Sequence, residues 1–216
     1  NNQKENKNIN PIFVIGLPRS GSTLTETIIS SGDNKIVDLG ETNLVNWSLL
    51  DTHRSELFQK MNVVQDINVN IDSITKKLLN AYENLNVPIK DKKVFLLDKS
   101  LENFHYIDLI LKIFPNAKFI HTYRNLEDNI IAIYKEFLSQ ISWSHSLKNI
   151  ILYIDNYLKT IEKQKKNNKN SILSISLEEL TDDPKKISKK IYQFCNIDWD
   201  EKCLNFHNKK NLFSKT

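Results

Sequence analysis

The sequence contains few of the residues that cross-link a chain or bind metals. Only two of its 216 residues are cysteines, Cys195 and Cys203. They could form at most one disulfide, they form no CxxC pair, and no histidine cluster lies beside them at metal-ligand spacing. We therefore expect two reduced packing residues and no metal site.

Long apolar runs are absent as well. No stretch approaches the ~20 residues that a membrane-spanning helix needs, and the polar start NNQKENKNIN lacks the layout of a secretion signal. A cytoplasmic location is the resulting expectation. The 30 Lys and Arg residues oppose 26 Asp and Glu, and the net charge of +4 does not indicate nucleic-acid binding. With 40% hydrophobic residues, the chain can bury the core of an ordinary globular protein.

Glycine is scarce and unevenly distributed, because all four glycines lie within the first 40 residues. The short apolar run 11–16 ends in Gly16 and predicts a buried strand, and residues 24–31 have helical character. The expected order is a strand, a tight loop and a helix. Backbone freedom is concentrated in that loop, which holds Gly16 and Gly21.

Short apolar runs alternate with helical stretches along the rest of the chain. This alternation predicts right-handed crossovers and a mostly parallel sheet with helices on both faces, an α/β layered domain. We expect a polar extension over 1–10 and a single domain over 11–216; the sequence lacks an initial Met, so it could be a segment of a longer protein. Further strands are predicted at 94–97, 118–122 and 171–175, and helices at 42–50, 71–83, 103–114, 126–138, 144–163 and 184–195.

The loop between the first strand and its helix has the sequence GLPRSGST, residues 16–23. Its glycine spacing follows the P-loop frame GxxxxG, in which backbone N–H groups and a helix N-terminus surround a phosphate. The ATP-binding version needs a lysine where this chain has Ser22, and the fixed positive charge is Arg19 instead. The loop therefore predicts an anion site of a different kind.

These residues resemble the 5'-phosphosulfate loop of sulfotransferases that use 3'-phosphoadenosine 5'-phosphosulfate (PAPS). They resemble bacterial sulfotransferases associated with tetratricopeptide repeats more than they resemble protein-tyrosine sulfotransferases. The resemblance implies a three-layer P-loop NTPase-like fold, PAPS as sulfuryl donor, its bisphosphate PAP as product, and no metal. Four further segments match in order: DKSLENF at 98–104, FPNAKFIHTYR at 114–124, LEELTDDP at 177–184 and CNIDW at 195–199.

The resemblance assigns roles at the sulfuryl-transfer end of the donor. Arg19 would hold the phosphosulfate oxygens and Lys99 would donate to the oxygen that leaves. Glu41, after Gly40, would be the general base for the acceptor. For Lys99 a solvated lysine, and for Glu41 an acid at a helix N-terminus, are the alternatives. The remaining donor-binding residues of the loop are Pro18, Ser20, Gly21, Ser22 and Thr23.

At the other end of the donor, Arg124 matches the arginine that binds the 3'-phosphate, with a surface ion pair as the alternative. Two positions depart from the family pattern. Ala132 stands where a serine usually also contacts the 3'-phosphate, and Leu177 replaces a tyrosine. The chain also ends at Thr216, before a segment with further nucleotide contacts. A nucleotide-binding relative without turnover is therefore one alternative function.

A second alternative is a P-loop kinase that uses ATP and magnesium, because Asp98 follows an apolar run as the magnesium-binding Asp of ATPases does. Ser22 in place of lysine argues against it. The acceptor class is not readable from the sequence, although segments 43–66 and 137–146 are expected to select it. Trp47 and Trp143 could line the acceptor pocket, but both are expected to pack in the core.

Overall fold

The computed structural model describes residues 9–32, 35–59, 69–89, 91 and 94–205. Its centre is a five-stranded parallel sheet with the strand order β2-β3-β1-β4-β5. The strands are β1 (Asn10–Gly16), β2 (Ile36–Gly40), β3 (Phe95–Asp98), β4 (Lys118–Tyr123) and β5 (Ile172–Ser176). The predicted mostly parallel sheet is confirmed, and β2, at one edge of the sheet, was not predicted.

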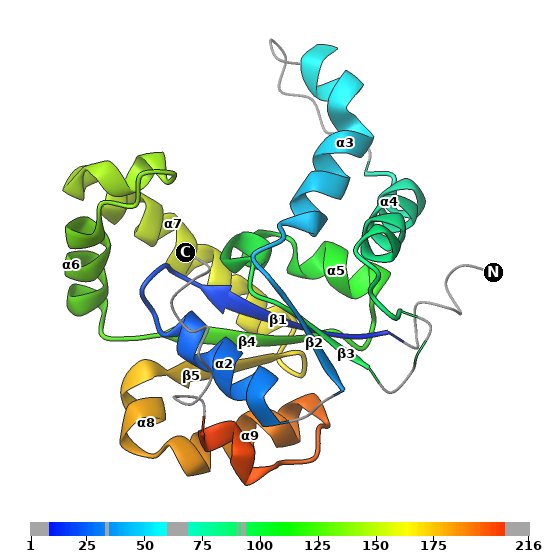
Figure 1. The fold of residues 1–216 in the computed structure, drawn as a ribbon. Coiled ribbons are helices and arrows are strands. Elements are labelled where there is room, and N and C mark those ends of the chain that lie inside the picture. Colours follow the sequence, from blue (N-terminus) through cyan, green and yellow to red (C-terminus); the bar gives the residue numbers. More distant parts are fainter. Residues whose placement is uncertain (1–8, 33–34, 60–68, 90, 92–93, 206–216) are drawn as a thin grey trace.

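Helices cover both faces of this sheet, as Figure 1 shows. One face carries α2 (Ser22–Gly32), α8 (Leu177–Asp182) and α9 (Pro184–Cys195). The other face carries α3 (Leu44–Gln59), α4 (Ile71–Asn84), α5 (Ile107–Ile113), α6 (Leu126–Glu136) and α7 (Leu147–Asn167). Short 3-10 helices η2 (Leu101–His105), η3 (Ser142–His145) and η4 (Glu201–Leu204) complete the described elements. This is the expected three-layer arrangement.

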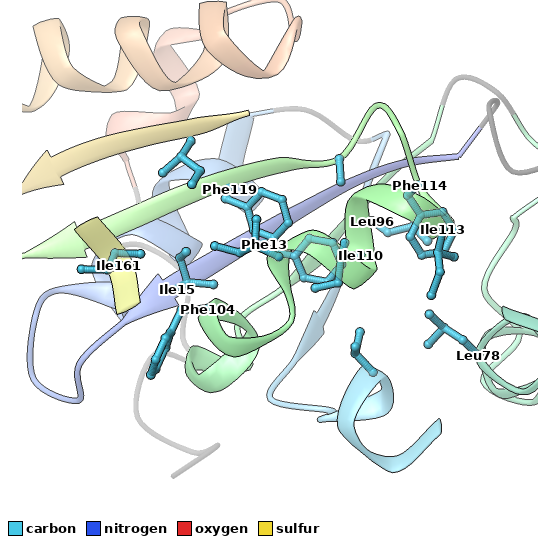
Figure 2. Close-up of a cluster of buried hydrophobic side chains, with 14 of the residues drawn as sticks. Phe13, Ile15, Leu78, Leu96, Phe104, Ile110, Ile113, Phe114, Phe119 and Ile161 are labelled. Atoms are coloured by element: carbon cyan, nitrogen blue, oxygen red, sulfur yellow. The ribbon is translucent and has the colours of Figure 1, made fainter. Parts of the chain in front are cut away.

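Each face of the sheet has its own hydrophobic core because alternate strand residues point to opposite sides. In β1, Phe13 and Ile15 face the larger core with Phe104, Ile110 and Phe119, as Figure 2 shows. Ile12 and Val14 face the smaller core, which α2 and α9 cover. The rings of Phe13 and Phe119 stack at 5.3 Å between centroids. Both cores brace β1 and therefore fix the loop that follows it.

Local capping explains where several helices begin. The side chain of Asn125 accepts from the N–H of Asp128 and starts α6, and Asp183 does the same for α9, whose first residue is Pro184. Ser176 caps α8, a six-residue helix that periodicity could not reveal. The predicted helix 103–114 is instead η2 followed by α5, separated at Tyr106.

Candidate active site

The loop after β1 takes the conformation that its glycines permit. Gly16 and Gly21 have φ values of +152° and +92°. A Cβ on Gly16 would lie 2.5 Å from the carbonyl oxygen of Thr122, and a Cβ on Gly21 would lie 2.7 Å from a methyl group of Leu177. Both positions therefore require the absence of a side chain. Leu177, one of the departures from the family pattern, packs directly on the loop.

Hydrogen bonds from β4 and α6 hold the rest of the loop. The hydroxyl of Ser20 donates to the carbonyl of Leu17 at 2.7 Å, and Ser20 Oγ lies 2.7 Å from Thr122 Oγ1. Asn129 is buried in α6 and its Nδ2 donates to the carbonyl of Pro18 at 2.8 Å. Because these partners fix both flanks of Arg19, the loop is a rigid turn.

Arg19 lies at the tip of this turn with a left-handed φ of 65°. Its side chain is half exposed, and its guanidinium approaches the Glu136 carboxylate at 3.6 Å. The helix α2 begins at Ser22, three residues later, with Ser22 buried and Thr23 exposed. An anion above the loop would therefore meet one guanidinium, the small hydroxyl residues and the positive end of a helix dipole.

Lys99 follows β3 and its side chain is buried, 8% exposed. Its backbone N–H donates to the carbonyl of Gly40 at 2.9 Å, which continues the β2–β3 ladder beyond the strand end. Its ammonium lies 2.5 Å from a carboxylate oxygen of Glu41, which is 57% exposed. The solvated-lysine alternative is therefore wrong. The structure brings Lys99 and Glu41 together in an ion pair that the sequence did not predict.

A second carboxylate, which sequence reasoning missed, also contacts Lys99. Glu26 Oε2 in α2 lies 3.6 Å from Lys99 Nζ, and the Glu26 side chain is 12% exposed. Burial raises the pKa of Glu26 to about 7, against the attraction of Lys99, and the charge of Asp38 acts in the same direction as burial. No sequence signal marks Glu26, since its burial and its contact with Lys99 both depend on the fold.

Asp98, the residue behind the magnesium alternative, is bound on both oxygens by protein donors. Thr42 donates to Oδ2 at 2.9 Å, and the Ser100 N–H and Asn103 Nδ2 donate to Oδ1 at 2.7 and 3.2 Å. Burial raises the pKa of Asp98. Among the described residues, no group of three or more His, Cys, Asp or Glu side chains could hold a metal ion. Asp98 instead braces the turn beside Lys99.

Arg124 follows β4 and lies beside the loop. Its Nη1 is 3.5 Å from the carbonyl oxygen of Arg19, and its Nη2 is 3.7 Å from Asp128. Its Nε is buried and has no hydrogen-bond partner among the described residues. The ion pair with Asp128 matches the alternative considered for this residue, although a buried donor without a partner is unusual in a folded protein. Ala132 lies two turns further along α6.

Two other expectations have mixed outcomes. Trp47 in α3 is 62% exposed, so its expected place in the core is wrong. Trp143 packs against the larger core and stacks on Tyr153 at 3.8 Å between ring centroids.

Cys195 and Cys203 are buried and free, as expected. In the described part of the chain, no helix is both long and apolar enough to span a membrane.

Comparisons with known proteins identify the family of the chain. A model of the sulfotransferase family matches residues 11–201. An uncharacterized protein of Aquifex aeolicus (strain VF5) is 26% identical over 207 residues, which are 93% of this chain and 27% of that protein. The chain thus spans about a quarter of this curated relative's length.

Solved structures share the fold. The sulfotransferase domain of the Synechococcus PCC 7002 olefin synthase is 23% identical, with a TM-score of 0.58 over 96% of this chain and 80% of that one. The sulfotransferase domain of the curacin biosynthetic pathway is 15% identical, with a TM-score of 0.63 over 92% of this chain and 78% of that one. The family model covers most of the chain, including the loop after β1 and the residues Lys99 and Arg124 that follow β3 and β4. The chain therefore belongs to the sulfotransferase family.

Proposed function

We propose that this protein transfers a sulfuryl group from PAPS to an acceptor hydroxyl or amine. The observation that carries the proposal is the order of groups along the carboxyl edge of the sheet. Glu41, Lys99, the Arg19 loop and Arg124 follow β2, β3, β1 and β4, which are adjacent strands in that order. Open parallel sheets bind ligands at this edge, where the strand order reverses.

The cations and donors fit a nucleotide with anionic groups at two ends. Arg19 and the amino end of α2 suit the 5'-phosphosulfate, and Lys99 lies on the adjacent strand. Arg124, with its buried unsatisfied Nε, suits the 3'-phosphate. Its contact with the Arg19 carbonyl joins the two ends of the site. We propose that residues 11–216 form one such domain.

In the proposed reaction, the acceptor oxygen or nitrogen forms a bond to sulfur while the bond from sulfur to the 5'-phosphate oxygen breaks in line. Glu41 takes the acceptor proton on the exposed side of the Lys99 pair. Lys99 and Arg19 offset the charge that develops on the departing phosphate oxygen. The exposed Trp47 lies on α3, which follows Glu41, and we propose that it faces the acceptor.

Ligand-dependent thermal unfolding tests the donor assignment. The bisphosphate PAP at 100 times its dissociation constant adds ~2.7 kcal/mol of stability, so its selective stabilisation over ATP with magnesium is expected. Stabilisation by ATP with magnesium alone would favour a kinase instead. Transfer of labelled sulfate from PAPS to a panel of hydroxyl and amine acceptors then separates an enzyme from a binding module without turnover.

Variants test the residues. Arg19→Ala and Lys99→Ala should each reduce turnover by roughly 100-fold or more, the usual loss of one transition-state donor. Lys159→Ala, which removes an exposed lysine on α7, is the matched control and should retain activity. Full turnover in the first two variants would overturn the site assignment.

A further inference from the structure

The Lys99 ammonium has two carboxylate neighbours, and the proposed transfer uses only one of them. Glu41 is mostly exposed and lies at 2.5 Å, whereas Glu26 is buried and lies at 3.6 Å. A buried carboxylate is costly unless its charge is compensated or neutralised. Glu26 therefore depends on Lys99, which the nucleotide would engage.

The surroundings of Glu26 already favour a bound proton. Burial of its carboxyl group is the main reason, and the negative charge of Asp38 in β2 acts in the same direction. Asp38 is exposed and also accepts from the N–H of Gly40 at 3.1 Å. The charged groups facing Glu26 are thus Lys99 and Asp38, with Glu41 beyond the ammonium.

The elements packed against the rest of α2 contact it elsewhere. Tyr192 of α9 donates to the carbonyls of Ile28 and Ile29, and both Tyr192 and Cys203 of η4 lie against Gly32. Proton exchange at Glu26 is therefore governed by the side of α2 that faces Lys99.

We infer that Glu26 is the proton-binding positioning residue of the nucleotide site: it holds Lys99 while the site is empty, and it takes up a proton when a bound nucleotide engages Lys99. This inference rests on the proposed function, because it requires a 5'-phosphate beside Lys99. Glu26 touches neither donor nor acceptor in this scheme and acts through Lys99.

The direction of the proton transfer follows from charge. A 5'-phosphate near Lys99 adds negative charge beside Glu26 and competes for the ammonium, so both effects favour the protonated carboxyl group. With a pKa of about 7 before binding, Glu26 is mainly ionised at about pH 8 and has a proton to gain. Phosphate groups are already doubly ionised there, since their second pKa is near 6. Uptake at that pH therefore reports on the protein.

Isothermal titration calorimetry with PAP measures this uptake, from binding enthalpies in two buffers of different ionisation enthalpy at about pH 8. Wild type should take up about half a proton or more, and its affinity should fall accordingly as the pH rises further. Glu26→Gln keeps the shape of the side chain and should bind PAP with no uptake from this site. Asp155→Asn, which removes an exposed carboxylate on α7, is the control and should retain the uptake.

A second variant keeps the test decisive if Glu26→Gln does not fold. Asp38→Asn removes a negative charge beside Glu26 at an exposed position, so the pH of maximal uptake should move down. Uptake that is equal in wild type, Glu26→Gln and Asp38→Asn would overturn the inference and leave the proposed function intact. Failure of wild type to bind PAP at all would overturn both.

Discussion

Arg124 is the residue that should distinguish a 3'-phosphorylated nucleotide from one without that group. Arg124→Ala should weaken PAP binding by about 10- to 100-fold, because a hydrogen bond to a charged group contributes about 1.5–3 kcal/mol. The affinity for adenosine 5'-phosphate, which lacks the 3'-phosphate, should change little in this variant. Titration calorimetry with both ligands measures the difference, with Arg54→Ala as the control. An equal loss for both ligands would place Arg124 elsewhere in the site.

A substitution at Ala132 should have the opposite effect and increase the affinity for PAP. Ala132→Ser would introduce the hydroxyl that the family resemblance implies at this position of α6, and it should strengthen PAP binding by roughly fivefold, about 1 kcal/mol. The same calorimetric titration measures it. In the double variant with Arg124→Ala, the gain should shrink, because both side chains would address one phosphate. An undiminished gain would mean that the two residues act independently.

Single residues also show how far motif reasoning extends. Arg19, Lys99 and Arg124 could be chosen from the sequence because each follows a predicted strand and matches a family motif, and the parallel sheet brings strand ends together. Glu41 was chosen from the family resemblance alone, because the strand β2 before it was not predicted. Glu26 could not be chosen, since its contact with Lys99 joins residues 73 positions apart through packing of α2 on the sheet. Burial, which raises its pKa, is likewise a property of the fold.

Among the elements, strands with continuous apolar runs were predictable and short or polar ones were not. The runs in β1, β3, β4 and β5 are buried on both faces, and their predicted bounds differ from the observed ones by one residue at most. β2 is an edge strand of only partly buried residues with an exposed Asp38 at its centre, so its pattern is weak. The strand β2 forms because it pairs with β3, a contact that depends on the tertiary fold.

The contact between the loop and α8 supports a prediction about stability. Gly21→Ala meets both a positive φ and the Leu177 side chain, whereas Gly40→Ala meets a positive φ of 64° in open space. Gly21→Ala should lower the free energy of unfolding by about 1–3 kcal/mol, and by more than Gly40→Ala. Urea denaturation measures both. Adding Leu177→Ala to Gly21→Ala should recover part of the excess, and no recovery would exclude the steric cause.

At the scale of the whole molecule, two buried titratable groups on opposite faces of the sheet have opposite effects on the pH dependence of the free energy of unfolding. His121 is buried, and its ring nitrogens contact the hydroxyl groups of Ser174 and Tyr157. Burial lowers the pKa of His121 to about 3, so its contribution to the free energy of unfolding is lost as pH falls from 6.5 towards 3. Glu26 has a raised pKa, so its contribution is present below pH 4.5 and is lost as pH rises towards 7. The two slopes partly cancel between pH 4.5 and 6.5.

Glu26→Gln should remove one of these slopes. The free energy of unfolding of the variant should then rise with pH more steeply than that of wild type across this window, by at most about 1.4 kcal/mol per pH unit. Chemical denaturation at several pH values measures the slopes. His121→Gln should tilt the curve the other way. Parallel curves for Glu26→Gln and wild type would show that Glu26 exchanges no proton on unfolding.

The strand order also separates the two halves of the proposed chemistry. In our proposal, the acceptor binds beside β2 and α3, near Glu41, whereas the adenylate part of the donor binds beside β4 and α6, near Arg124. Each half is built from a continuous piece of chain. A chimera in which a relative's segment replaces β2 and α3 should therefore change its acceptor specificity and still bind the donor. Directed evolution could use this separation by varying the two segments independently.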